Sequence, residues 1–298
     1  MKLATFSHAD STRIGVVESD AVIDVAAADA SLPRDMIALL EAGAAALDAV
    51  RRVVSAGRAP RLPLAEVRLR APVLRPPKFL AIGLNYADHI AEARPAGYEA
   101  PAYPIFFNKQ STCAIGHGEA IHLPRASHRL DYEGELAFVI GRRCRHVPRE
   151  RAHEVVAGYL VCNDVSVRDW QRRTPTMTMG KSFDTHGPIG PWLVTPDEVG
   201  DPHVLGIRTW VGDELRQDSN TKYMIHDCWA QIEHLTTAFT LEVGDVISTG
   251  TPAGVGGAMN PPKWLRAGDR VRIEVERVGV LENPVIEEPA DTAWIQGS

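Results

Sequence analysis

The sequence is poor in the features that mark several classes of protein. Its four cysteines form no C-x-x-C pair, which argues against a zinc ribbon or a thioredoxin-like redox site and favours reduced thiols. No apolar run approaches the roughly 18 residues that span a membrane, and the amino terminus lacks the apolar stretch of a signal peptide. The formal net charge of -6 excludes a generally basic, nucleic-acid-binding surface. We therefore expect a cytoplasmic protein that binds neither membranes nor nucleic acid.

The 298 residues are enough for one large domain with a smaller attachment. Near the amino terminus, short strand-like runs precede an alanine-rich segment with helical periodicity. Several prolines between Pro60 and Pro77 then indicate a connector, because proline withholds a backbone donor. We place a boundary near residue 70, which gives a small N-terminal α/β domain over 1–70 and a second domain over 71–298. The expected N-terminal elements are strands over 2–6, 12–17 and 21–24 and a helix over 34–57.

From residue 78 onward, short β-like runs dominate the sequence, and glycine, proline and aspartate separate them. Helical patterns cover only 87–93, 150–156 and 223–239, and no regular βαβ alternation is visible. These features favour a β-rich α+β domain over a doubly wound parallel sheet. The strand-like runs are FLAIGL, PIFFNK, LAFVIG, GYLVCND, WLVT, IRTWVG, DVISTG and RVRIEVE.

The segment LDYEGELAFVIG holds two glutamates, Glu133 and Glu135, in an otherwise apolar strand-like run. Residues i and i+2 of a strand share one face, so these carboxylates repel each other and are costly to desolvate unless a cation lies between them. The alternatives are exposed glutamates, or one glutamate paired with an arginine. Asp164 ends the run GYLVCND and offers a third carboxylate. Three oxygen ligands without cysteine suit Mg²⁺, Mn²⁺ or Ca²⁺ rather than zinc.

Two further segments carry residues typical of a reaction site. In NYADHIAEA, His89 and Glu92 lie three apart, which on a helix places them on one face, as for a general base and its orienting carboxylate. The following stop, Arg94-Pro95-Ala96-Gly97, is typical of a short lid, although an incidental surface pair is the simpler alternative. Lys181 lies in the glycine- and proline-rich loop MGKSFDTHGPIGP, where it would bind a carboxylate or stabilise an enolate, or else be a solvated surface lysine.

Neither glycine-rich segment fits a nucleotide-binding motif. The G-K-S triplet lacks the earlier glycine of a phosphate-binding loop, because Pro175 occupies that position. The run TGTPAGVGG follows a strand but leads into AMNPPKW, which cannot begin the helix of a dinucleotide-binding turn. Its glycines instead permit close approach of the backbone to a ligand, or simply form a turn.

Five segments, taken in order, resemble the fumarylacetoacetate hydrolase family. They are GLNYADHIAE, RLDYEGELAFVIG, CNDVSVRDWQ, GKSFDTHGPIGPW and GDVISTGTPAGVG, and the similarity extends from about Pro77 to Pro284. The resemblance implies a mixed β-roll catalytic domain, a homodimer and a Mg²⁺ or Mn²⁺ site, with Ca²⁺ as a possible substitute in crystals. The N-terminal residues resemble the variable extra domain of longer members.

The resemblance also implies roles for individual residues. It places the metal on Glu133, Glu135 and Asp164. It makes His89 and Glu92 the catalytic pair of a lid and Lys181 the conserved loop lysine. It assigns four residues to substrate binding: Tyr86, Gln171, Gly250 and Thr251. Further pocket walls are expected from Arg172, Arg173, Met177, Tyr223 and residues 258–266.

The resulting hypothesis is a metal-dependent hydrolase that cleaves a carbon–carbon bond in an acylpyruvate or related 2,4-dioxo acid. His89, oriented by Glu92, would activate water, and Lys181 would help to hold the enolate that leaves as pyruvate or a relative. The alternatives on the same site are an oxaloacetate decarboxylase, and an isomerase or hydratase of a hydroxymuconate-type diacid. A sugar-acid member that cleaves a 2,4-diketo-3-deoxy acid is another option. A non-catalytic binding protein would be expected to lack the carboxylates or the histidine pair, and this chain has both.

Overall fold

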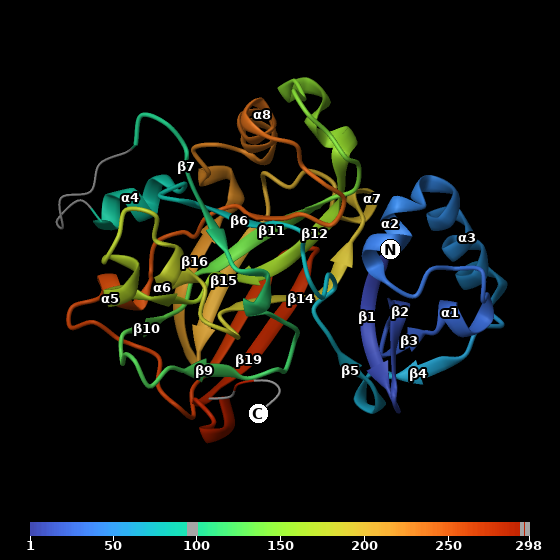
Figure 1. Ribbon diagram of the computed structural model, residues 1–298, viewed down its shortest axis with the longest axis horizontal. Helices are drawn as coiled ribbons and strands as arrows, with labels where there is room; N and C mark the ends of the chain where they lie inside the picture. Colours follow the sequence, from blue (N-terminus) through green and yellow to red (C-terminus); the bar gives the residue numbers. More distant parts are fainter. Residues whose placement is uncertain (94–100, 293–294, 296–298) are drawn as a thin grey trace.

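The computed structural model describes residues 1–93, 101–292 and 295. The expected helix stop at Arg94–Gly97 lies outside these residues. Figure 1 shows a small N-terminal lobe (blue) beside a larger strand-rich body, with the two joined along a common sheet. Within the described residues, no helix is long and apolar enough to cross a membrane.

The N-terminal lobe is an antiparallel meander covered by helices. The expected strands are present, but the single helix expected over 34–57 is wrong. Asp35 caps the first of two helices by accepting from the Ala38 amide. The helical conformation is then interrupted at Gly43, whose φ of 71° does not fit a right-handed helix. The lobe contains β1 (Lys2–His8), β2 (Ser11–Glu18), β3 (Ala21–Ile23), β4 (Arg61–Pro63), β5 (Arg68–Leu69), α1 (Val25–Ala28), α2 (Met36–Glu41), α3 (Gly43–Ala56) and η1 (Leu64–Glu66).

The lobe is continuous with the rest of the molecule. Strand β1 pairs with β14 (Gly187–Val194), so Leu3 lies opposite Leu193. Leu3 and Leu193 also belong to one hydrophobic cluster, which extends from the lobe helices to the central strands. The N-terminal residues therefore bury apolar surface against the larger body, and the domain boundary near residue 70 stays a prediction.

Three sheets build the larger body. The first continues the lobe meander, the second is a separate antiparallel sheet with one parallel edge strand, and the third is a two-stranded ribbon. After β14, the first sheet continues through β12 (Val156–Asn163), β11 (Gly134–Ile140), β17 (Val246–Ser248), β6 (Phe79–Gly83) and β7 (Ile105–Lys109), and β8 (Ala114–Ile115) pairs with β14. The second contains β16 (Glu214–Asn220), β15 (Gly206–Val211), β18 (Arg270–Val275), β19 (Gly279–Glu287) and β9 (Ile121–Leu123); the ribbon pairs β10 (Leu130–Asp131) with β13 (Ser166–Val167).

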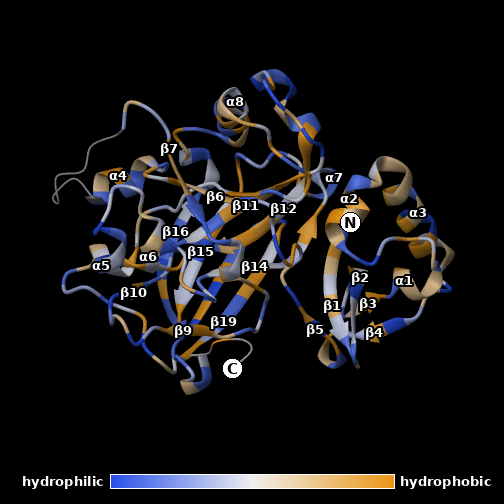
Figure 2. Cartoon of the chain, in the orientation of Figure 1, coloured by the Kyte–Doolittle hydropathy of each residue, from blue (hydrophilic) through white to orange (hydrophobic). Residues whose placement is uncertain are grey.

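Strand β11 is buried on both faces because it lies between two hydrophobic clusters. Leu136, Phe138 and Ile140 pack into the cluster between the two large sheets. Ala137 and Val139 point the other way, into the cluster shared with the lobe. The period of two that predicted this strand therefore serves two cores. Figure 2 shows hydrophobic residues along the central strands and hydrophilic residues in the peripheral loops. The β-rich α+β class expected from the sequence is confirmed.

The remaining helices are short, and two expectations need correction. The segment expected as a helix over 150–156 is a 3-10 helix, and the one expected from residue 223 begins only at Cys228, where Asp227 caps the Ala230 amide. The mostly polar β16 was not expected as a strand. The elements are α4 (Ala87–Ala93), α5 (Arg168–Gln171), α6 (Thr178–Lys181), α7 (Pro196–Val199), α8 (Cys228–Ala238), η3 (Ser111–Cys113), η4 (Arg149–Val155), η5 (Thr221–Tyr223), η6 (Gly256–Ala258) and η7 (Ala290–Thr292).

A buried histidine before β14 makes stability depend on pH. His186 is fully buried, its ring stacks on Phe183, and its Nε2 lies 2.8 Å from the main-chain oxygen of His122. Burial lowers the pKa of His186 to about 3. Between about pH 6.5 and pH 3, the histidine binds a proton in the unfolded chain but not in the folded chain. Stability therefore falls as the pH falls through this range.

We expect His186→Gln to remove this share of the pH dependence, because a glutamine amide can still donate to the same carbonyl without binding a proton. Between about pH 6.5 and pH 5, the wild type should lose about 2 kcal/mol more free energy of unfolding than the variant. Urea unfolding at a series of pH values measures the two slopes. Parallel slopes would show that His186 does not contribute.

Candidate active site

Three carboxylates meet at the point where β11 begins and β12 ends. Antiparallel pairing places Gly134 opposite Asn163, so the residues just beyond, Glu133 and Asp164, are neighbours. The Asp164 amide donates to the Glu133 carbonyl at 2.9 Å. With Glu135, these side chains are buried and offer oxygen atoms that all lie within 4.8 Å of one another. The strand register thus assembles the three residues that the sequence predicted as metal ligands.

The negative charge of Glu135 is disfavoured by its surroundings, so this carboxylate would gain most from a bound cation. Its Oε2 accepts hydrogen bonds from the Ser248 hydroxyl at 2.5 Å and the Gly250 amide at 2.9 Å. Burial, and then repulsion by Asp164 and Glu133, raise the pKa of Glu135 well above its ordinary value. A divalent cation among the three carboxylates would offset the cost of burying this charge and replace the repulsion by attraction, and carboxylate oxygens are ligands that Mg²⁺ and Mn²⁺ prefer. The residues therefore fit a divalent metal site.

Glu133 is held by two basic side chains. Its Oε1 lies 2.7 Å from a terminal nitrogen of Arg168, and its Oε2 lies 2.6 Å from Nζ of Lys181. Burial alone would raise the pKa of Glu133, but the attraction of Arg168 and Lys181 outweighs it and lowers the pKa. The sequence-based alternative of a glutamate paired with an arginine is thus also true of Glu133, together with its place in the carboxylate cluster.

Two lysines share Asp164. The ammonium of Lys181 is 2.7 Å from Oδ2, and that of Lys109 is 2.6 Å from Oδ1. Lys109, the last residue of β7, also donates to the main-chain oxygen of Lys181. Both side chains are almost completely buried, so Lys181 is not a solvated surface lysine. Sequence reasoning missed Lys109 and Arg168; a lone basic residue in the apolar run PIFFNK was the available signal for Lys109.

His89 and Glu92 lie on α4 and contact each other, with Nδ1 of His89 3.1 Å from Oε2 of Glu92. The other oxygen of Glu92 accepts from the Gly254 amide at 2.9 Å. Gly254 has a φ of 103°, and a Cβ there would lie 2.0 Å from the Arg216 carbonyl oxygen, so only glycine brings the amide to Glu92. The pair is therefore fixed to the glycine-rich segment after β17.

The four residues assigned to substrate binding lie around this cluster. Tyr86 is buried, and burial followed by the nearby Glu135 carboxylate raises its pKa. Gly250 donates to Glu135, as described above. The Thr251 hydroxyl donates to the Gly134 carbonyl and accepts from Gln217, so protein groups already engage it. Gln171 accepts from Arg168 at 3.0 Å, which places it beside Glu133. Their contacts with substrate stay predictions.

The expected pocket walls differ in their surroundings. Met177 has its sulfur 3.6 Å from the Gln171 amide nitrogen, and its φ is 58°. Arg173 is exposed and stacks on Trp170, with 3.8 Å between the guanidinium carbon and the ring centroid. Arg172 and Tyr223 are also exposed. Met177 is thus tied directly to an assigned substrate residue.

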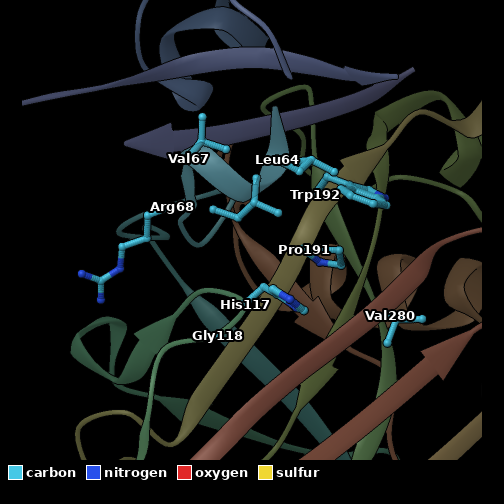
Figure 3. Close-up of a pocket in the computed structure, with 9 residues that line it drawn as sticks. Leu64, Val67, Arg68, His117, Gly118, Pro191, Trp192 and Val280 are labelled. Carbon is cyan, nitrogen blue, oxygen red and sulfur yellow. The ribbon is translucent and has the colours of Figure 1, made fainter. Parts of the chain in front are cut away.

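A cavity of about 460 Å³ lies elsewhere, between the N-terminal lobe and β14 and β19 (Figure 3). Its wall contains none of the residues assigned to the site and is mainly apolar. The lining residues are Leu64, Val67, Arg68, Leu69, His117, Gly118, Pro191, Trp192 and Val280. The charged cluster, rather than this cavity, carries the groups needed for chemistry.

Comparison with known proteins shows to which family the chain is related. Residues 78–286 match the family described as fumarylacetoacetate (FAA) hydrolase C-terminal. The chain belongs to the fumarylacetoacetate hydrolase family. The match covers all three carboxylates, Lys181 and the His89–Glu92 pair, and the family resemblance inferred from sequence motifs is confirmed.

Relatives extend the similarity over nearly the whole chain. The Xenopus laevis protein named oxaloacetate tautomerase fahd2, mitochondrial, is 41% identical over 292 residues, which are 96% of this chain and 90% of that protein. The Homo sapiens protein named oxaloacetate tautomerase FAHD2A, mitochondrial, is 42% identical over 267 residues, covering 89% and 84%. The N-terminal residues of this chain are thus part of the similarity.

Solved structures share the fold. A maleylpyruvate hydrolase from Sphingobium sp. SYK-6, in complex with manganese(II) and pyruvate, is 32% identical with a TM-score of 0.80, covering 97% of this chain and all of that one. A fumarylacetoacetate hydrolase from Exiguobacterium antarcticum is 38% identical with a TM-score of 0.84 and the same coverage. The protein is therefore an enzyme of this family with an acidic site for a divalent metal.

Proposed function

We propose that the protein is a divalent-metal-dependent oxaloacetate tautomerase, which interconverts the enol and keto forms of oxaloacetate or a closely related 2-oxo diacid. The observation that carries this proposal is the 41% identity to a named oxaloacetate tautomerase over 96% of the chain. The sequence motifs alone favoured hydrolysis, and the site chemistry serves both reactions. Tautomerisation requires only a proton transfer and a stabilised enolate, and the described residues supply groups for each.

The metal would be Mg²⁺ or Mn²⁺, held by Glu133, Glu135 and Asp164; the manganese in the maleylpyruvate hydrolase structure supports Mn²⁺. When bound, such an ion supplies Lewis-acid polarisation of the 2-oxo group. Lys181, which touches both Glu133 and Asp164, places a fixed positive charge beside the same position. It would stabilise negative charge on the 2-oxygen in a buried site, where such charges interact strongly.

His89 is the group proposed to move the proton. Its Nδ1 is engaged with Glu92, so Nε2 is the nitrogen that would take a proton from C3 of the keto form. The same proton, or one exchanged with solvent, would be returned to the 2-oxygen to give the enol. Glu92 stabilises the imidazolium that exists between the two transfers. This sequence consumes no water and breaks no carbon–carbon bond.

Acylpyruvate hydrolysis is the second candidate. The pairing of His89 with Glu92 also suits activation of a water molecule, and the maleylpyruvate hydrolase shares the fold at 32% identity. In that reaction, hydroxide would attack the distal carbonyl and pyruvate would leave as its enolate. Decarboxylation of oxaloacetate requires neither the histidine nor water, so it makes least use of the site.

Rapid mixing of the Mn²⁺-loaded protein with enol-oxaloacetate tests the proposal. We expect the ultraviolet absorbance of the enol to decay much faster than in buffer with Mn²⁺ alone, and NMR to show keto-oxaloacetate as the product. Protein stripped of metal with a chelator is the control. Release of a carboxylic acid and pyruvate from maleylpyruvate, without acceleration of the enol decay, would instead establish the hydrolase.

A further inference from the structure

Asp131 is a fully buried aspartate that lies outside the carboxylate cluster, and its two oxygens receive four donors. Oδ2 accepts from Nε of Arg168 at 2.8 Å and from the Gly257 amide at 2.9 Å. Oδ1 accepts from the amides of Tyr132 and Gly256 at 3.0 and 2.9 Å. Every partner is a donor, so this position suits a side chain that only accepts hydrogen bonds.

One set of these contacts leads to the proposed base. Asp131 holds the amides of Gly256 and Gly257, and the hydroxyl of Tyr132 holds the Gly254 carbonyl at 2.7 Å. Two consecutive residues therefore fasten the loop over residues 254–257. The amide of Gly254 in this loop is the one that binds Glu92, which in turn contacts His89. The loop position thus sets where Glu92 lies.

The other contact leads to the metal site. Arg168 binds Asp131 through Nε and Glu133 through a terminal nitrogen. A guanidinium is planar and rigid, so anchoring one side fixes the direction of the other. Asp131 therefore orients the arginine that orients a metal ligand.

We infer that Asp131 is a positioning residue for the reaction: it fixes the 254–257 loop that holds Glu92 and, through Arg168, the carboxylate of Glu133. Among the described residues, its side chain forms no hydrogen bond or ion pair with His89 or with the three clustered carboxylates, so we infer that it acts through these partners. The inference rests on the proposed function to the extent that His89 and Glu92 carry the proton. It does not depend on which 2-oxo acid is the substrate.

The test is Asp131→Asn, which keeps the size of the side chain but turns one acceptor into a donor. That donor would face the N–H groups of Arg168 and Gly257, or those of Tyr132 and Gly256. We expect kcat at saturating Mn²⁺ to fall about 10- to 100-fold, the range typical of lost outer-shell partners. We also expect the Kd for Mn²⁺ to rise about 10-fold, because Arg168 loses its anchor. Unchanged values of both would overturn the inference.

A double-mutant cycle separates positioning from simple loss of stability. If Asp131 acts through Glu92, Glu92→Gln will lower kcat much less in the Asp131→Asn background than in the wild type. A merely structural aspartate would give the same factor in both backgrounds, which would contradict the role assigned to the loop. The substrate is whichever of enol-oxaloacetate and maleylpyruvate the wild type converts, and the Mn²⁺ titration needs no turnover. Failure of the proposed function is therefore distinguishable from failure of this inference.

Two further variants keep the test interpretable. Asp24→Asn is the matched control. Asp24 is also buried and also accepts from an arginine side chain (Arg13) and a backbone amide (Ala27), but it lies in the N-terminal lobe. It should lower stability and leave kcat within about two-fold. Gly257→Ala keeps the aspartate but brings a Cβ to 3.0 Å from both Oδ2 of Asp131 and the Trp264 ring, so the loop must shift relative to Asp131. It should reproduce the loss in kcat even where Asp131→Asn does not fold.

Discussion

Replacing Glu135 with glutamine will weaken Mn²⁺ binding by more than the roughly 10- to 100-fold loss that follows removal of an outer-shell partner. The change removes one of three carboxylates that would hold the metal, while the glutamine oxygen can still accept from Ser248 and Gly250. Tautomerase activity should fall in parallel at low Mn²⁺. Isothermal titration with Mn²⁺, or the electron paramagnetic resonance signal of free Mn²⁺, measures the affinity.

The metal-free form of this variant carries a second expectation. Burial and the neighbouring carboxylates disfavour the charge on Glu135, so removing that charge should leave the free energy of unfolding equal or higher at neutral pH. Glu154→Gln is the control, because Glu154 forms an ion pair with Arg151 on the surface and has no part in the carboxylate cluster. Wild-type affinity for Mn²⁺ in the Glu135 variant would show that the metal does not use this residue.

Replacing His89 with alanine will lower kcat by about 10²- to 10⁴-fold, the usual contribution of a general acid–base group. Mn²⁺ affinity should stay close to that of the wild type, because the three residues that would hold the metal do not include His89. Glu92 acts through His89, so the double variant His89→Ala, Glu92→Gln should be about as slow as His89→Ala alone. Enol-oxaloacetate decay at saturating Mn²⁺ measures kcat for each.

The control for this series is His153→Ala, since His153 is an exposed histidine on the 3-10 helix η4. It should retain wild-type kcat and Mn²⁺ affinity. A His89 variant with at least half of the wild-type kcat would remove His89 as the proton carrier. Reduced Mn²⁺ affinity in that variant would instead give His89 a part in the metal site.

The β-rich class and most of the central strands could be predicted from the sequence, because a period of two is a local property of the chain. It also predicted the three clustered carboxylates and proposed roles for His89, Glu92 and Lys181, since the E-x-E pair, the His89–Glu92 spacing and the five ordered motifs are visible without a fold. Its errors were local as well. The expected helix over 34–57 did not account for the left-handed conformation at Gly43. Strand β16 was missed because its residues are mostly polar, and its place depends on pairing with β15 and on the hydrogen bonds of Gln217 to Gly134 and Thr251.

Which of these residues meet, and which groups balance their charge, depends on the tertiary structure. The register of β11 against β12 places Glu133 beside Asp164. The period of two in each segment does not select that register, because a shift by two residues keeps every side chain on the same face. The counter-charges come from three basic residues that are distant in the sequence from the acids they bind. The separation is 55 residues for Lys109–Asp164, 48 for Lys181–Glu133 and 37 for Arg168–Asp131. A buried carboxylate must be compensated by whichever cation the fold brings within a few ångströms. Distance along the chain says nothing about that choice, because electrostatic attraction depends on distance in space and on exclusion of water.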